Sequence, residues 1–221
     1  MKLHKSEVII ESAGAKSSSR FSIEASQQAF AVLSSTIYED KIKAPIRELS
    51  TNAYDAHVEA GCSEKPFEVH LPNSIDSEFR VRDYGISLSH EDVMHLYTTY
   101  FGSNKRNSNS LNGCLGLGSK SPFAYTDQFW VTAYKDGKKR NYVATVDSEG
   151  SRLDEYPECD TDEANGFEVG FVVKEDDFSK FKDTAQQVYK YFKTQPVVTG
   201  SDFEHSTPSA AKITGKGWEF T

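Results

Sequence analysis

Three polar residues with helical spacing are the clearest candidates for chemistry in this chain. Glu48, Asn52 and Asp55 follow one another at intervals of four and three residues, so a helix over this run places all three on one face. A carboxylate, an amide and a second carboxylate suit a general base, a ligand for a hydrated metal ion and an acid that orders water. The alternative is a solvated polar face, and two segments downstream favour the catalytic interpretation.

The first of these segments is rich in glycine. It runs from Gly113 to Ser121 as G-C-L-G-L-G-S-K-S. Glycine lets backbone N–H groups approach an anion closely, and Ser119 and Lys120 would add donors and positive charge. The segment is neither a Rossmann fingerprint nor a Walker A loop, because the strands and helix that those motifs need are not predicted around it. It indicates a phosphate-binding loop of another kind, with a glycine-rich turn that binds no ligand as the alternative.

The second segment is an Asp-x-Gly turn. Asp83 ends a predicted strand, and Gly85 follows two residues later. A buried carboxylate there can accept a hydrogen bond from an exocyclic amine such as that of adenine, and the contact discriminates strongly because a wrong base leaves a buried charge unpaired. A turn aspartate is the alternative. Taken in order, the acidic helix, the Asp-x-Gly turn and the glycine-rich loop indicate an ATP site.

Periodicity and capping signals predict the elements that would position these residues. The central helix is predicted from Lys41 to Ala60, with Pro45 in its first turn and Gly61 just after its end. A hairpin is predicted around Asp136-Gly137. The other predicted segments are strands over 7–10, 21–23, 67–71, 79–83, 129–134, 140–146, 166–173 and 213–220, helices over 26–37, 89–96 and 178–192, the last stopped by Pro196, and a polar loop over 98–112.

The order of these elements predicts the fold class. The hairpin region lacks the strict alternation of strands and helices that a doubly wound α/β fold requires. We therefore predict an α+β fold, with helices layered on one mixed, mainly antiparallel sheet. One domain is expected over residues 1–221, with a core over about 20–195, an N-terminal strand and a C-terminal extension.

Composition excludes several classes of function. The 221 residues are 37% hydrophobic and 26% charged, with a net charge of −8, so nucleic acid is not expected as a general partner. Cys62, Cys114 and Cys159 form no C-x-x-C pair, which argues against zinc and for reduced thiols in a cytosol. No run approaches the ~18 apolar residues of a membrane span. A cytoplasmic protein is expected, with membrane association only through a partner.

Together the motifs resemble the nucleotide site of the GHKL superfamily, which includes gyrase, the ninety-kilodalton heat-shock chaperone, sensor histidine kinases and MutL. Glu48 to Ala56 matches the N-box in its gyrase, chaperone and MutL form. Asp83 to Ser87 resembles the D-x-G-x-G box, Gly113 to Gly118 resembles the box that closes on the phosphates, and Gly166-Phe167 stands where the family usually has Gly-Thr. The resemblance covers about residues 20–175 and implies the Bergerat ATP-binding fold.

A second resemblance is narrower. Ser103-Asn104-Lys105, followed by G-x-x-G-L-G-S-K-S-P-F-A-Y-T-D from Gly113 to Asp127, is similar to the lid of the phage rIIA family. This resemblance implies a phage protein that acts in the host cytoplasm in lysis control or counter-exclusion.

The superfamily resemblance implies a role for individual residues. Asn52 would help to coordinate Mg²⁺, and Glu48 would polarise the attacking water as general base. Because histidine kinases usually lack this carboxylate, Glu48 favours ATP hydrolysis over phosphoryl transfer to a histidine. Lys105 and Lys120 are candidates to replace the lysine that the following domain supplies in gyrase and MutL, and slow hydrolysis is expected. The implied nucleotide contacts are Asn52, Asp55, Asp83, Gly85, Ser87, Lys105, Gly113, Leu115, Gly116, Leu117, Gly118, Ser119, Lys120 and Phe167.

The resemblance also implies a switch. A lid from Thr99 to Gly118 would order around the nucleotide and gate dimerisation or binding of an unknown protein partner. Ser87 and Phe167 depart from the family pattern near the expected adenine position. They support the alternative of a non-hydrolytic nucleotide- or protein-binding module on the same fold. A histidine-kinase-type phosphotransferase is a third reading, disfavoured by Glu48 and by the lack of a phospho-accepting helix.

Overall fold

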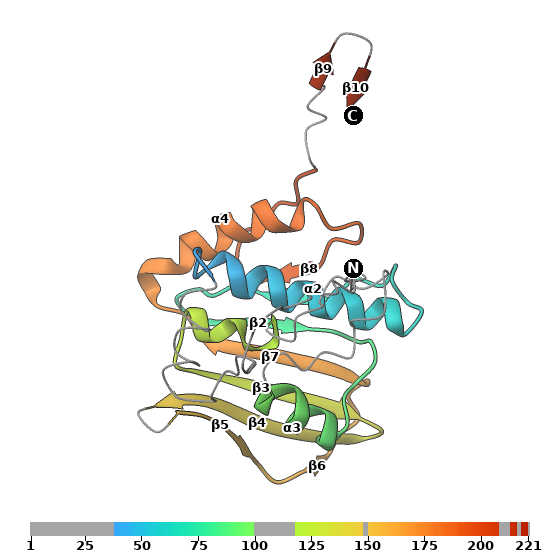
Figure 1. Cartoon of the computed structure of the whole chain (residues 1–221), viewed down its shortest axis with the longest axis vertical. Coiled ribbons are helices and arrows are strands. Elements are labelled where there is room, and N and C mark those ends of the chain that lie inside the picture. The colour runs from blue at the N-terminus through green and yellow to red at the C-terminus, as the bar shows by residue number, and fades with distance from the viewer. Residues whose placement is uncertain (1–37, 100–117, 148–149, 208–212, 216–217, 221) are drawn as a thin grey trace, which may run out of the picture.

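The computed structural model describes residues 38–99, 118–147, 150–207, 213–215 and 218–220 (Figure 1). The segments predicted over 7–10, 21–23 and 26–37, and nearly all of the loop predicted over 98–112, lie outside these ranges. Within them, helices and a mixed, mainly antiparallel sheet form an α+β structure, which confirms the predicted class. Among the described residues, no helix is both long and apolar enough to cross a bilayer.

The main sheet has the strand order β5-β4-β3-β7-β2-β1-β8, and a short strand, β6, pairs with β4. Its pairs are antiparallel except for β1 with β8, which run parallel. The predicted hairpin joins β3 to β4 through Asp136 and Gly137, whose φ angles of 55° and 76° fit the tight turn that such a dipeptide favours. The strands are β1 (Glu68–His70), β2 (Glu78–Arg82), β3 (Gln128–Lys135), β4 (Lys138–Asp147), β5 (Gly150–Glu155), β6 (Cys159–Asp160), β7 (Gly166–Val172) and β8 (Val197–Thr199).

Three α-helices cover one face of this sheet: α2 (Lys43–Glu59), α3 (His90–Thr98) and α4 (Phe178–Tyr189). Figure 1 shows α4 beside α2, with α3 over the β3 and β4 side. Two 3₁₀ helices, η2 (Gly118–Ala124) and η3 (Glu175–Asp177), complete the layer. A single buried cluster joins the helices to alternate strand residues, and its members include Leu49, Ala53, Val69, Val81, Val93, Tyr97, Val131, Val169, Phe171, Phe181 and Ala185.

Local signals in the sequence explain where α2 and α3 begin and end. The Asp40 carboxylate accepts backbone N–H groups of Ile42 and Lys43, at 3.1 and 2.9 Å, so α2 starts two residues later than predicted. Gly61 follows its end with φ of 71°, as the sequence predicts. Ser89 and Asp92 form a reciprocal capping box at the start of α3.

Two predictions in the C-terminal half need correction, and two strands were missed. The helix predicted to reach Phe192 ends at Tyr189, because Phe192 leaves the helix to pack against Phe67 and Tyr189, with ring centroids 5.6 and 5.8 Å apart. The single strand predicted over 213–220 is instead an antiparallel pair, β9 (Ile213–Gly215) and β10 (Trp218–Phe220), so the chain reverses after Gly215. Strands β5 and β6 were not predicted.

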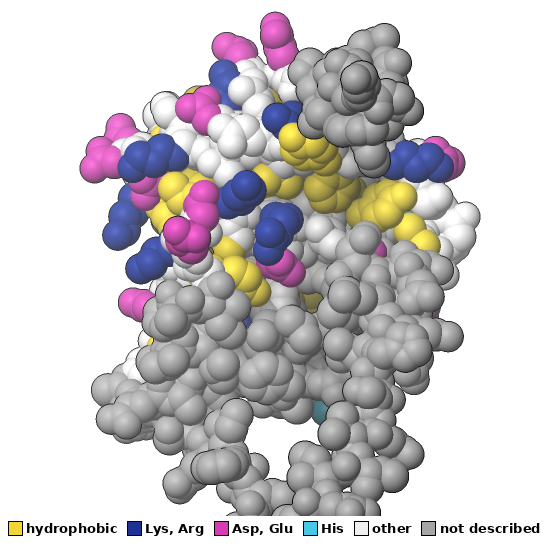
Figure 2. All heavy atoms as spheres, turned by 45° about the horizontal axis from the view of Figure 1, so that its top comes forward, with side chains coloured by type: hydrophobic (Ala, Val, Ile, Leu, Met, Phe, Trp, Pro, Cys, Tyr) yellow, Lys and Arg dark blue, Asp and Glu magenta, His cyan; other side chains and the backbone are white. Residues whose placement is uncertain are grey.

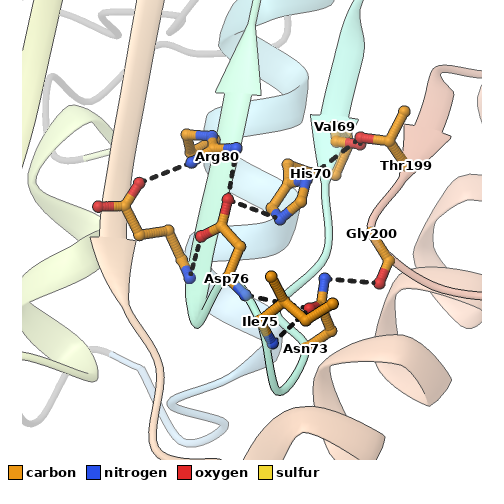
Figure 3. A network of polar contacts seen from close by, with 9 residues as sticks. Val69, His70, Asn73, Ile75, Asp76, Arg80, Thr199 and Gly200 are labelled. Carbon is orange, nitrogen blue, oxygen red and sulfur yellow. Dashed lines mark hydrogen bonds and ion pairs between the residues drawn. The ribbon is translucent and has the colours of Figure 1, made fainter.

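A polar network fastens β8 to the edge of the sheet (Figure 3). His70 on β1 lies between β8 and the β1–β2 turn: its Nδ1 is 3.3 Å from Thr199 Oγ1, and its Nε2 is 3.2 Å from Asp76 Oδ2. Arg80 Nη2 donates to the same Asp76 oxygen at 2.9 Å. Asn73 Nδ2 donates to the carbonyl of Gly200 at 2.9 Å. The network links β8, which comes late in the sequence, to β1 and the β1–β2 turn, which come more than 100 residues earlier.

Figure 2 shows the surface on the side of α2 and α4. Lys and Arg side chains alternate there with Asp and Glu, around a band of hydrophobic side chains. Among the described residues on this face, charges of one sign do not gather into a broad patch.

Candidate functional site

Helix α2 presents the predicted polar face toward other elements of the fold. Leu49 and Ala53 are buried in the core, which fixes the rotation of the helix. Glu48 and Asn52 lie on the neighbouring face and are partly buried, with 23% of the Glu48 side chain exposed. Asp55, one turn further on, is fully buried. The three residues therefore run from a partly open position into the interior.

The last glycine of the glycine-rich segment lies directly against this face. A Cβ atom added to Gly118, the first residue of η2, would be 2.7 Å from Glu48 Oε2 and 3.6 Å from Asn52 Nδ2. While the Glu48 carboxylate stays in this position, residue 118 has no room for a side chain, and glycine fits there. Segments 66 residues apart in the sequence, at 52 and 118, meet here. The Glu48 carboxylate, the Asn52 amide and the backbone of Gly118 therefore lie close together.

The Asp-x-Gly turn packs against the other end of the same helix. Asp83 is only 6% exposed, and its Oδ1 accepts the N–H of Gly85 at 3.0 Å. A Cβ at Gly85 would be 2.3 Å from the carbonyl carbon of Ala56, so a larger residue there would push the turn away from α2. The N–H of Ile86 also donates to the Ala56 carbonyl at 3.3 Å. Backbone contact thus holds the Asp83 carboxylate beside the Asp55 end of α2.

The start of β7 forms the next wall beside Asp83. The N–H of Asp83 donates to the Phe167 carbonyl at 2.9 Å, and the Ser87 hydroxyl donates to the Gly166 carbonyl at 3.0 Å. Gly166 has φ of 146°, and a Cβ there would be 2.1 Å from the Asp83 carbonyl oxygen, so this position requires glycine. Ser87 therefore forms a hydrogen bond to the start of β7 at the position where the GHKL pattern has glycine.

Phe167 has an aromatic partner. Its ring stacks on Tyr97 of α3, with centroids 6.3 Å apart and planes 19° apart. Burial, reinforced by the nearby Asp83 carboxylate, raises the pKa of Tyr97 far above its usual value, so its hydroxyl remains protonated. The surroundings of Asp83 are thus apolar and aromatic on the side of α3.

Lys120 has partners that its sequence context does not predict. Its side chain is 4% exposed, and its ammonium donates to the carbonyl of Leu96, near the end of α3, and to the carbonyl of Thr99 at 2.9 Å. Burial lowers the pKa of Lys120 to about 8. Lys120 therefore closes the C-terminal end of α3, and Ser119 beside it is also buried.

Two further neighbours of Glu48 were missed by the sequence reasoning. Arg47 Nη2 lies 2.7 Å from Glu48 Oε1, and Tyr38 is close enough for the carboxylate to contribute, after burial, to raising the pKa of the tyrosine to about 12. Arg47 could have been noticed because it is adjacent to Glu48 in the sequence. Tyr38 gave no signal, since it precedes α2 and reaches the site only through the fold.

The structure brings together part of the predicted site. Glu48, Asn52 and Gly118 meet at one end of α2, while Asp55, Asp83, Gly85, Ser87 and Phe167 are grouped toward the other. Lys105, Gly113, Leu115, Gly116 and Leu117 lie outside the described residues, so their predicted contacts with phosphate stay predictions.

The donor set fits a weakly held hard cation better than a dedicated metal cage. In the described part of the chain, no group of three or more His, Cys, Asp or Glu side chains could hold a metal ion. Mg²⁺ keeps several of its waters and needs few protein ligands, often together with substrate phosphates. Asn52 offers an amide oxygen for such an ion, and the nitrogen of the same amide lies 3.6 Å from a Cβ built at Gly118.

Comparison with known proteins adds no relative from which a function could be transferred. No family model matches the chain, and no curated protein shows significant sequence similarity to it.

Proposed function

We propose that this chain binds Mg-ATP and hydrolyses it slowly, as a GHKL-type domain with the Bergerat fold. The observation that carries the proposal is the approach of Gly118 to Glu48 and Asn52, where an added Cβ would be 2.7 Å from the Glu48 carboxylate. A glycine, a carboxylate and an amide at one point suit the binding and cleavage of a phosphate chain. Asp83 at the other end of the helix suits recognition of a base.

The proposed orientation places the adenine next to Asp83. Its buried carboxylate would accept the exocyclic amine, and Gly85 would keep the turn close to α2. Ser87 and Phe167 would border the base. Because the Asp83 carboxylate is a buried acceptor, a ligand that lacks the amine would lose one charge-assisted hydrogen bond and bind less tightly, by about 1–3 kcal/mol. Asp55, buried between the two ends, would order a water that bridges the helix and the base.

The proposed chemistry is located at Glu48 and Asn52. Mg²⁺ would neutralise phosphate charge, held by the amide oxygen of Asn52. Glu48 would accept a proton from the attacking water, and its partly exposed carboxylate allows that water to reach it. General-base assistance of this kind is typically worth ~10²–10⁴ in rate. Arg47 donates to Oε1 of the same carboxylate, so the proton would go to Oε2, the oxygen that faces Gly118.

The remaining contacts complete the proposed cycle. The lid from Thr99 to Gly118, which includes Lys105, would close over the phosphates. Its closure would switch a homodimer contact or a contact with a protein partner. The rIIA-like lid sequence supports a role in phage lysis control or counter-exclusion in the host cytoplasm.

A second function is favoured by a specific observation. The ammonium of Lys120 is buried and donates to two carbonyls at the end of α3, so binding of a phosphate by Lys120 would require it to give up those bonds. Together with Ser87 and Phe167, this supports a non-hydrolytic module that binds a nucleotide or a protein on the same fold.

Phosphate release from Mg-ATP, measured together with nucleotide affinity, distinguishes the two functions. We expect Glu48→Ala to lower the hydrolysis rate by about 10²–10⁴-fold while the affinity changes little. Glu59→Ala, which removes an exposed carboxylate from the other end of α2, is the matched control and should keep the full rate. ATP binding without hydrolysis by the unsubstituted chain would favour the non-hydrolytic module, and equal rates for the chain and for Glu48→Ala would reject the catalytic role.

A further inference from the structure

His57 connects helix α2 to the Asp83 turn through both nitrogen atoms of its ring. The side chain is fully buried two residues beyond Asp55. Its Nδ1 lies 2.8 Å from the carbonyl oxygen of Lys65, and its Nε2 lies 2.7 Å from the backbone nitrogen of Tyr84. A buried histidine with two backbone partners of this kind is a fixed link between segments and not a mobile surface group.

The two partners determine the protonation state of the ring. The Lys65 carbonyl can only accept, so the proton lies on Nδ1; the Tyr84 amide can only donate, so Nε2 carries a free electron pair. A second proton on Nε2 would point at the N–H of Tyr84. Burial lowers the pKa of His57, and the positive charges of Lys65 and Arg82 act in the same direction. The ring is therefore neutral, with a single tautomer.

The link holds the residue next to Asp83. Tyr84 lies between Asp83 and Gly85, and the N–H of Gly85 donates to the Asp83 carboxylate at 3.0 Å. The same turn contacts Ala56, the residue before His57, through the N–H of Ile86 at 3.3 Å. Backbone packing at Gly85 and the His57 ring thus fix the turn on α2 at two adjacent points.

We propose that His57 is a positioning residue that holds the Asp83 carboxylate in its place relative to α2. It would not contact the nucleotide. The inference deepens the proposed function and rests on it for the role of Asp83 in base recognition, but the positioning itself concerns only contacts within this chain. This role predicts that the position of the Asp83 turn depends on the hydrogen-bond acceptor at Nε2 and not on the aromatic ring itself.

Two substitutions separate the acceptor from the ring. In His57→Gln, the side-chain oxygen lies at about the distance of Nε2 from the backbone and can accept the N–H of Tyr84. In His57→Asn, the shorter amide can still donate to Lys65 but falls short of Tyr84. Loss of a hydrogen bond of ordinary strength is worth roughly tenfold in an equilibrium. His57→Gln should therefore preserve the position of the turn, and His57→Asn should lose it.

The first measurement is amide hydrogen exchange. We expect the Tyr84 and Gly85 amides to exchange about tenfold faster in His57→Asn and within about threefold of the unsubstituted chain in His57→Gln. The amide of Val131, in the central strand β3, reports whether the whole domain is destabilised. Faster exchange at Val131 by the same factor would overturn the proposal, because it would show a general stabilising role. Unchanged exchange at Tyr84 would also overturn it.

The second measurement is the affinity for Mg-ATP. We expect the dissociation constant to rise about tenfold in His57→Asn and to recover within about threefold in His57→Gln. If the unsubstituted chain binds ATP and His57→Asn binds it equally well, positioning of Asp83 is contradicted while the proposed function stands. If the unsubstituted chain does not bind ATP, the proposed function fails, and the exchange rates alone decide whether His57 positions the turn.

Discussion

The space around Gly118 is governed by one flexible carboxylate. An added Cβ would meet the terminal oxygen of Glu48 at 2.7 Å, whereas its distances to Asn52 Nδ2 and to Glu48 Cβ would both be 3.6 Å. The end of a long side chain moves more readily than a backbone. A methyl group at residue 118 would therefore displace the carboxylate and leave the fold intact. A substitution at Gly118 therefore tests whether hydrolysis depends on the position of the Glu48 carboxylate.

We expect Gly118→Ala to lower kcat for ATP hydrolysis by about 10–100-fold, because a displacement of about 1 Å can cost this much. The free energy of unfolding should change by less than about 1 kcal/mol, since alanine suits a helical position at least as well as glycine. Steady-state phosphate release and thermal unfolding measure the two quantities.

The double variant of Gly118→Ala with Glu48→Ala is the control. In the absence of the carboxylate, the added methyl group should have no further effect on the rate. A rate for Gly118→Ala equal to that of the unsubstituted chain would mean that the position of Glu48 does not limit the reaction.

For single residues, the sequence predicts the contacts that depend on local geometry. The common face of Glu48, Asn52 and Asp55 follows from helical periodicity, and the need for a small residue at Gly85 follows from its motif. The partners of His57 and Lys120 could not be predicted, because both are backbone carbonyls or amides brought close by the fold. A backbone group gives no signal in the identity of the residue that carries it.

Among the elements, η2 and α3 are joined by Lys120. Its ammonium bonds the Leu96 and Thr99 carbonyls at the end of α3, where a helix leaves acceptors unpaired and where a cation is favoured by the helix dipole. The same burial lowers its pKa to about 8. This clamp, formed by the Lys120 ammonium and the carbonyls of Leu96 and Thr99, stabilises the end of α3 and keeps a charge away from water.

This clamp gives a pH dependence of known sign. The pKa of Lys120 is about 8 in the folded chain and 10.5 for the free side chain, so between these values the unfolded chain binds more protons and stability rises with pH. We expect the unfolding free energy of the unsubstituted chain, minus that of Lys120→Met, to rise from pH 8 to about 9.5. The slope should be at most about 1.4 kcal/mol per pH unit.

Urea unfolding of both proteins at several pH values measures the slope. Lys43→Met, which removes an exposed lysine from the start of α2, is the matched control and should show no such trend relative to the unsubstituted chain. A difference that stays constant over this range would show that the Lys120 ammonium keeps an ordinary pKa.

Elements with their own apolar period were predicted well, and those without one were not. Strand β7 and helices α2 and α3 carry such patterns, as well as glycine or capping signals. Strand β5 has only one apolar residue, Leu153, and forms because β4 offers it an unpaired edge. Helix α4 stops before its apolar period does, because Phe192 packs better outside the helix. In both cases long-range contacts prevail over the local pattern.

At the scale of the whole molecule, the topology explains why the site is assembled from four segments. The antiparallel neighbours β2 and β7 place Asp83 beside Phe167, and α2 crosses the same part of the sheet with its polar face toward η2. The His70 and Asp76 network closes the opposite edge through β8 (Figure 3). A nucleotide at the proposed site would thus touch α2, η2, the Asp83 turn and the start of β7.

A ligand that bridges these elements can act as a switch of assembly. We expect saturating Mg-ATP to convert Glu48→Ala, which should bind without hydrolysis, from monomer to dimer. Sedimentation velocity with and without nucleotide measures the change, with ADP as the control. An unchanged sedimentation coefficient at saturation would contradict nucleotide-driven dimerisation.

We propose that this fold holds an ATP site organised by Asp83. Calorimetric titration of Mg-ATP into the unsubstituted chain and into Asp83→Asn tests this proposal. We predict binding with a dissociation constant on the order of micromolar for the unsubstituted chain and its loss in Asp83→Asn. Asparagine has one acceptor oxygen, so its NH2 group would face either the N–H of Gly85 or the exocyclic amine. Absence of binding to the unsubstituted chain, or equal affinity for both proteins, would contradict an ATP site organised by Asp83.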